Sequence, residues 1–153
     1  MVISNDVAGL LSAPWDSQDI EGRARRLQAD LEAFVKGDPI SVSLKPYKHK
    51  NAYFGRLDKP RQELWEVRSR DPKPGLRVLG RFAETDVFVG LIWRPRSADW
   101  NGRKALGMGD SLEFEIAKIA CEEEWETLFP KHEPKTGEDL HDYISEKAFP
   151  VGA

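Results

Sequence analysis

The chain has 153 residues, of which 40% are hydrophobic and 32% are charged, a composition that suits one globular domain with a single core. Five Trp, seven Phe and three Tyr exclude a largely disordered chain. The one cysteine, Cys121, cannot form an internal disulfide, which favours a reducing compartment. No apolar run approaches the roughly 18 residues that a membrane span needs, and residues 1–11 contain Asp6 where a secretory signal has basic residues. We therefore expect a cytoplasmic protein that makes no contact with a membrane.

The net charge of −3 hides an uneven distribution along the chain. Residues 45–104 hold 15 Lys and Arg against 7 Asp and Glu, a net charge of +8, and the rest of the chain holds 8 against 19, a net charge of −11. A basic middle suits a phosphate-bearing partner, and acidic flanks can shield it, repel nucleic acid or dock on basic surfaces. Alternatively, the two parts only balance each other's charge within one soluble domain.

The first long element that the sequence predicts is an amphipathic helix over residues 20–36. Its apolar positions recur at helical spacing: Ile20, Ala24, Leu27, Leu31, Phe34 and Val35. Gly37 and Pro39 mark its end, because Gly accepts the left-handed geometry of a C-cap and Pro cannot continue a helix. Residues 40–44 alternate between apolar and polar side chains and predict a short strand.

Three strands follow, over residues 64–70, 76–82 and 87–94, separated by turn-forming residues at 71–75 and 83–86. They predict an antiparallel meander. A register with Val67 opposite Val78 gives one apolar face to the first hairpin. The second hairpin continues that face if Val78 lies opposite Leu91, and the other predicted pairs are Phe82 with Val87, Gly80 with Val89 and Leu76 with Trp93.

The opposite face of this meander collects charge, with Arg68 directly opposite Arg77 and with Glu66 and Arg81 nearby. Directly opposed like charges repel unless an anion lies close to them. Two explanations stay open: Glu66 and another acidic residue neutralise the pair, or the face is a phosphate-binding concavity.

Two further helices are expected after the meander. Asp110 or Ser111 can cap a helix that runs to about Phe129, and residues 136–148 predict a short helix with an apolar stripe. We expect a single domain over residues 1–153, with a core at about 18–128 and an acidic helical extension at 129–153.

Two motifs resemble a known family. Leu64-Trp65-Glu66-Val67-Arg68 and Gly75-Leu76-Arg77-Val78-Leu79, followed by the apolar strand to Trp93, are similar to the core pattern L-[YW]-E-[LV]-R and G-[YL]-R-V of the RelE/ParE superfamily of bacterial toxins. The similarity covers residues 64–96. It implies an α+β fold of the RelE-like kind, in which an N-terminal helix packs on an antiparallel meander sheet and C-terminal helices follow.

The resemblance also implies a function: the toxin of a type II toxin–antitoxin system, which cleaves mRNA on the ribosome and inhibits translation. It implies an antitoxin protein, the ribosome and mRNA as partners, and neither a cofactor nor a metal. Arg68 and Arg77 match the motifs and, with Arg81, are the expected catalytic residues that hold and stabilise the phosphate. The expected RNA-binding residues are Lys48, Lys50, Arg94, Arg96, Arg103 and Lys104. The candidates for general acid or base are Tyr47, His49 and Tyr53.

The sequence departs from the family pattern after the last strand. No Tyr, His or Glu follows that strand closely, and Pro95 interrupts the usual basic ending. Two alternatives to the nuclease are therefore kept. One is a ParE-like toxin that inhibits gyrase without catalysis, and the other is an inactive or repurposed binding module on the same scaffold, with its basic face occupied by the acidic C-terminal region.

Overall fold

The computed structural model describes residues 1–45, 52–57, 63–109, 111–145 and 147–150, and these contain four helices and seven strands. In chain order the elements are β1 (Val2–Ile3), α1 (Asn5–Leu11), α2 (Gln18–Val35), β2 (Ile40–Ser43), β3 (Phe54–Arg56), β4 (Trp65–Ser69), β5 (Leu76–Glu84), β6 (Val87–Pro95), α3 (Leu112–Leu128), α4 (Leu140–Tyr143) and β7 (Ala148–Pro150). The fold thus mixes helices and strands. Among the described residues, no helix has the length and apolar character needed to cross a membrane.

All seven strands form one sheet, in the order β1-β6-β5-β4-β3-β2-β7. The strands from β3 to β6 are antiparallel neighbours, whereas β1 pairs with β6, and β2 with β3 and β7, in parallel. The predicted meander is therefore the centre of a larger, mixed sheet. The strands β1 and β7 escaped prediction because strands of two or three residues are too short to show alternation.

The register of the first hairpin is as predicted. Val67 lies opposite Val78, Trp65 opposite Gly80, and Ser69 is at the end of the same face. Because side chains alternate along a strand, this register was fixed by the requirement that the apolar residues of β4 and β5 share one face.

The register of the second hairpin differs from the predicted one. Val78 pairs with Trp93 and not with Leu91, and the pairing shifts between Leu79 and Gly80. At the shift, a Cβ on Gly80 would stand 1.9 Å from a backbone carbonyl oxygen of β6, so the absent side chain allows the two backbones to approach. The four pairs predicted for this hairpin were wrong, because alternation alone does not reveal a local irregularity.

The close approach at Gly80 gives a stability prediction. Gly80→Ala should lower the free energy of unfolding by about 3 kcal/mol, because β5 and β6 must separate to admit the methyl group. Gly22→Ala on α2, where a Cβ meets nothing within 4 Å, should raise it by about 0.5–1 kcal/mol. Urea unfolding measures both, and a Gly80→Ala protein as stable as the wild type would contradict the observed pairing.

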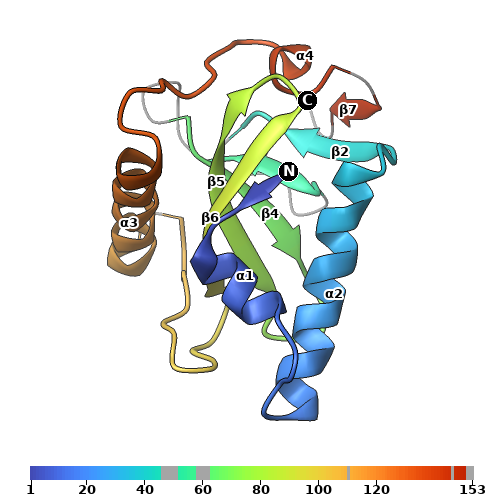
Figure 1. Ribbon diagram of the computed structural model, residues 1–153, viewed down its shortest axis with the longest axis vertical. Coiled ribbons are helices and arrows are strands. Elements are labelled where there is room, and N and C mark those ends of the chain that lie inside the picture. The colour runs from blue at the N-terminus through green and yellow to red at the C-terminus, as the bar shows by residue number, and fades with distance from the viewer. Residues whose placement is uncertain (46–51, 58–62, 110, 146, 151–153) are drawn as a thin grey trace.

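Helices cover both faces of the sheet, with α1 and α2 on one side and α3 on the other (Figure 1). Leu27 of α2 packs in a core with Trp65, and Trp125 of α3 packs in a second core with Leu79 and Leu91. The sequence predicted that this second face is solvated and basic. It is partly covered instead, because the shifted register turns Leu91 toward it and provides an apolar surface for α3.

The helix boundaries follow their capping residues. The Ser17 side chain accepts the N–H of Ile20 at the start of α2, and Gly37, at φ +74°, follows its end, so the predicted helix is confirmed. The Ser111 hydroxyl likewise accepts the N–H of Phe114 at the start of α3, as predicted. The predicted strand at 40–44 is β2. The helix predicted over 136–148 was wrong in extent, since only α4 is helical and β7 follows it.

The C-terminal region is anchored to the sheet. Tyr143 is fully buried against Trp65, with ring centroids 4.8 Å apart, and its hydroxyl donates to the Glu63 carboxylate at 2.5 Å. Arg56 Nη1 donates to the Gly137 carbonyl oxygen at 3.0 Å, and β7 pairs with β2. The helix α4 thus contributes to the first core, and β7 extends the sheet.

This anchor should make stability depend on pH. Burial raises the pKa of the Glu63 carboxyl above its ordinary value of 4.5, against the opposing effects of Tyr143 and Arg56. The folded chain therefore holds this proton more tightly, and the contribution to the free energy of unfolding falls as pH rises from about 4.5 through the folded pKa. Glu63→Gln removes this fall, so its stability relative to the wild type should improve as pH rises. Urea unfolding at several pH values measures this difference in free energy of unfolding, with the exposed Glu138→Gln as control. A difference between Glu63→Gln and the wild type that is constant with pH would contradict the raised pKa of Glu63.

Candidate anion-binding site

Three arginines lie in register across the centre of the sheet. Arg68 of β4 pairs with Arg77 of β5, and Arg77 pairs with Arg94 of β6. Paired residues on neighbouring strands project from the same face, so these three, the arginine row, share the face that carries α3. The sequence predicted the first pair, and Arg94 joins it because of the register shift.

Glu66 supplies negative charge within the row. Its Oε1 accepts Arg68 Nε at 2.9 Å, and its Oε2 lies 3.9 Å from Arg77 Nε, an ion pair too long for a hydrogen bond. The exposed fractions are 5% for Glu66, 8% for Arg68 and 9% for Arg77. The sequence left two explanations open for this pair, a neutralising Glu66 or a phosphate-binding concavity. In the structure Glu66 pairs with both arginines, and all three side chains are buried.

Arg81, the third expected catalytic arginine, lies outside the row. It is 6% exposed, its Nη2 is 3.8 Å from Glu122 of α3, and its guanidinium lies 5.9 Å from the centre of the Trp125 ring. These contacts join β5 to α3. The expected position of Arg81 on a solvated phosphate-binding face was therefore wrong, since α3 packs over it.

The surroundings of Arg77 carry an excess of positive charge. The pKa of Arg77 is lowered to about 10, mainly by burial and also by the neighbouring Arg68, Arg96 and Arg70, while Glu66 opposes these effects. Within the described part of the chain, the buried Arg77 Nε and Glu66 Oε2 have no hydrogen-bond partner. A shift of this size corresponds to roughly 3 kcal/mol of disfavoured charge. A phosphate oxygen near these guanidinium groups would offset that cost.

Arg70, Arg94 and Arg96 form the accessible rim of the same group, because each is only half-buried. We call these three residues, with Arg68 and Arg77, the arginine cluster. Arg94 Nη1 donates to the Trp93 carbonyl oxygen at 2.8 Å, and Arg96 Nη1 donates to that of Gly107 at 2.6 Å. Both bonds fix the direction of a guanidinium group without neutralising its charge.

Arg94 also faces a hollow of about 430 Å³ between the loop after β6 and α3. Arg103, the exposed Lys104, and Glu113 and Ile116 of α3 complete much of its wall. Burial lowers the pKa of Arg94, and the neighbouring Arg103 lowers it further. The expected RNA-binding residues Arg94 and Lys104 are thus brought together here.

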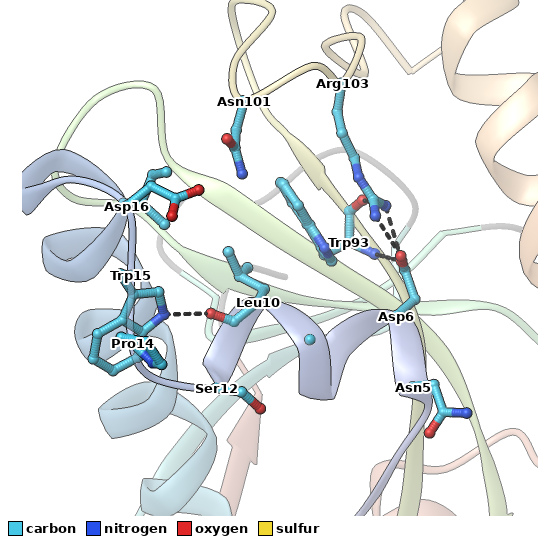
Figure 2. Close-up of a pocket in the computed structure, with 12 residues that line it drawn as sticks. Asn5, Asp6, Leu10, Ser12, Pro14, Trp15, Asp16, Trp93, Asn101 and Arg103 are labelled. Carbon is cyan, nitrogen blue, oxygen red and sulfur yellow. Dashed lines mark hydrogen bonds and ion pairs between the residues drawn. The ribbon is translucent and has the colours of Figure 1, made fainter.

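Arg103 has a second role, visible in a hollow of about 380 Å³ beside α1 (Figure 2). Asp6 accepts both terminal nitrogens of Arg103, and the guanidinium lies 4.2 Å from the centre of the Trp93 ring. Asp16 and Asn101 point into this hollow (Figure 2). The carboxylates of Asp6 and Asp16 in this hollow repel a phosphate group. Arg103 therefore ties the loop after β6 to α1 and is not available here as an RNA contact.

Of the three expected acid or base groups, only Tyr53 belongs to the part of the chain that the structure describes. Tyr47, Lys48, His49 and Lys50 lie outside the described residues. The pKa of Tyr53 is raised by burial and by Asp30 and Asp38, which belong to α2 and to the turn after it. Tyr53 also packs against the first core, so its assignment as an acid or base beside the arginine row was wrong.

Gly55 of β3 is a site residue that the sequence did not reveal. It pairs with Glu66, and a Cβ on it would stand 2.6 Å from Arg68 Nη2. The guanidinium of Arg68 therefore lies against the bare backbone of β3. The only signal in the sequence is a glycine between Phe54 and Arg56, which is compatible with many other roles.

The other reactive side chains are engaged elsewhere. Cys121 is on the buried face of α3, and burial raises the pKa of its thiol to about 12. Ring nitrogens of His132 and His141 lie 3.0 Å from the carbonyl oxygens of Ala83 and Ile144. Within the described ranges, no three His, Cys, Asp or Glu residues come together as metal ligands.

The shared carboxylate should be essential to the sheet. Glu66→Gln should lower the free energy of unfolding by about 3 kcal/mol, because it leaves Arg68 and Arg77 buried without their counter-charge. Glu113→Gln, an exposed carboxylate on α3, should change it by less than about 0.5 kcal/mol. Urea unfolding compares the two variants. Equal stabilities would mean that Glu66 does not hold the row together.

The arginine cluster is the feature from which a function has to be inferred. No family model matches the chain, and no curated protein or solved structure matches it either.

Proposed function

We propose that the protein binds the phosphate groups of single-stranded RNA at the arginine cluster and thereby inhibits translation. In this proposal it is a toxin with the RelE/ParE fold, and its partner is an antitoxin protein. The observation that carries this proposal is the row Arg68–Arg77–Arg94, in register across β4, β5 and β6, with the Glu66 carboxylate paired to Arg68 and Arg77.

The charge of the cluster supports a polyanionic ligand. Repulsion among Arg68, Arg70, Arg77 and Arg96 is built into the fold and disfavours the charged form of Arg77. Titratable groups held in perturbed states cluster at functional sites. RNA phosphates at the half-buried rim would neutralise this charge while Glu66 keeps the buried arginines in place. In this proposal Arg94 and Arg96 contact the ligand, and the buried Arg68 and Arg77 raise the positive electrostatic potential at that rim.

The order of the elements supports the scaffold. A helix, α2, precedes the antiparallel strands β4, β5 and β6, and α3 follows them. This is the arrangement that the motif resemblance at residues 64–96 implies. The parallel strands at the edges and the packing of α3 over Arg81 are features that the resemblance does not account for.

RNA cleavage is the second candidate, and one observation favours it. The Glu66 carboxylate stands between Arg68 and Arg77, so a proton acceptor lies beside two cations of the kind that stabilise a phosphorane. However, Glu66 is buried and already bonded to Arg68. A substrate would first have to displace that arginine, so binding without cleavage is the function that the geometry supports best.

The binding claim is tested with a labelled single-stranded oligoribonucleotide and fluorescence anisotropy at increasing salt. Each phosphate contact adds about 0.7 to the slope of log K against log salt, so Arg94→Gln with Arg96→Gln should reduce that slope by roughly 1.4. The matched control is Arg25→Gln with Arg26→Gln, which removes the same charge from the exposed face of α2. Equal losses in the two double variants would show nonspecific attraction and contradict the proposed site.

The cellular claim is tested by induced expression, alone and together with any small reading frame found next to the gene. The proposal expects arrested translation, relief by the neighbouring protein, and no new mRNA 5′ ends. New mRNA 5′ ends that are absent when Glu66→Gln is expressed would favour the nuclease. Circular dichroism of the purified variant has to show that it is folded. DNA-damage signalling with intact translation would favour a gyrase inhibitor, and normal growth would contradict every toxin assignment.

A further inference from the structure

A hollow of about 430 Å³ adjoins the arginine cluster and shares Arg94 with it. The end of β6, the loop that follows it and the start of α3 lie at the same end of the sheet and border this hollow (Figure 1). Its volume falls within the range of about 300–1,000 Å³ that is usual for small-molecule sites. A ligand whose phosphate lies at the half-buried rim therefore has room beside it for a second chemical group.

The wall of the hollow is apolar on the side of α3. Ile116 and Ala117 belong to the helix, and Gly102 presents bare backbone from the loop after β6. The guanidinium of Arg94 is planar and half-buried, and its bond to the Trp93 carbonyl oxygen fixes its direction. An apolar wall beside a fixed guanidinium plane suits a flat ring, because unpaired RNA bases stack on arginine planes and on apolar side chains.

Glu113 places a carboxylate in the same wall. It is exposed and lies four positions before Ala117, so the two residues share one side of α3. A carboxylate repels a phosphate, so the base and not the phosphate is the part of a nucleotide that fits inside the hollow.

The carboxylate also distinguishes the bases, because it accepts hydrogen bonds and donates none. Guanine has two adjacent donors, N1–H and the 2-amino group, that match the two oxygens of a carboxylate. Adenine and cytosine have an amino group beside a ring nitrogen that only accepts. Uracil has one N–H between two carbonyl oxygens, which a carboxylate repels. Guanine is therefore the base that the wall of the hollow fits best.

We propose that the hollow binds a guanine base of the RNA whose phosphate lies at Arg94 and Arg96. This inference rests on the RNA binding proposed above and adds a base preference to it. Glu113 accepts the N1–H and the 2-amino group, and the ring lies between Arg94 and the apolar wall of α3. Lys104, exposed at the edge of the hollow, neutralises the neighbouring phosphate.

The base preference is tested by fluorescence anisotropy with labelled oligouridylates of equal length that carry guanine, hypoxanthine or adenine at one central position. Guanine should bind about tenfold more tightly than adenine, because it alone forms the bidentate pair. Hypoxanthine, which lacks the 2-amino group, should fall between the two. Equal affinities would overturn the base preference and leave the proposed RNA binding in place, whereas the absence of binding to all three would contradict both.

The location of the base is tested with Glu113→Ala, and Glu126→Ala near the other end of α3 is the matched control. Each variant removes one exposed carboxylate from the helix, so the overall charge changes equally, and circular dichroism confirms that both are folded. Glu113→Ala should reduce the preference for guanine over adenine to less than about twofold, and Glu126→Ala should retain it. A preference that survives in Glu113→Ala would overturn the proposed site.

A free nucleotide carries the same base, so guanosine monophosphate is compared with the guanine-containing oligonucleotide. It should bind at least about tenfold more weakly, because it brings only one phosphate to the arginine cluster. Equal affinity of the two ligands would assign the hollow to a free nucleotide and contradict RNA as its ligand.

Discussion

Two buried arginines that share one carboxylate are the constraint on which the rest of the structure depends. Arg68 and Arg77 face each other across β4 and β5, and Glu66 lies close enough to pair with both. Without Glu66 the centre of the sheet would hold opposed cations away from water, at a cost of about 3 kcal/mol, a large part of the stability of a small domain. With it, the two arginines are tolerated inside the sheet. The neighbouring Arg94 and Arg96 at the half-buried rim make the site a candidate for an anionic ligand.

The position of α3 determines which part of that charge a ligand can reach. The register shift at Gly80 turns Leu91 toward the second face, and α3 packs there with Trp125 in its core. Arg81 lies beneath α3, whereas the rim at Arg94 and Arg96 is half-exposed. The same helix presents its other face, around Ile116, to solvent. One element therefore shields the sheet and limits the anion site.

Sequence reasoning succeeded where one local signal dominated. The spacing of α2, the serine caps of α2 and α3 and the alternation of β4 and β5 each depend on residues that are neighbours in the chain. It failed where a contact joins distant segments. The close approach at Gly80 moved Arg94 into the arginine row, and the burial of Arg68 and Arg77 depends on strands and a helix far from both. The motif pointed to Arg68 and Arg77, which the structure places side by side, but only packing could decide between the two explanations of their pairing and show that Arg81 contacts α3.

The most direct measurement of the central claim is the response of individual arginine side chains to a ligand. In ¹H–¹⁵N spectra of the Nε–H groups, titration with a short single-stranded oligoribonucleotide should shift Arg94, Arg96 and Arg77 together, with one dissociation constant, while Arg25 on the far side of the fold remains unchanged. Shifts of equal size at Arg25 and at the cluster, or none at Arg77, Arg94 and Arg96, would contradict the account.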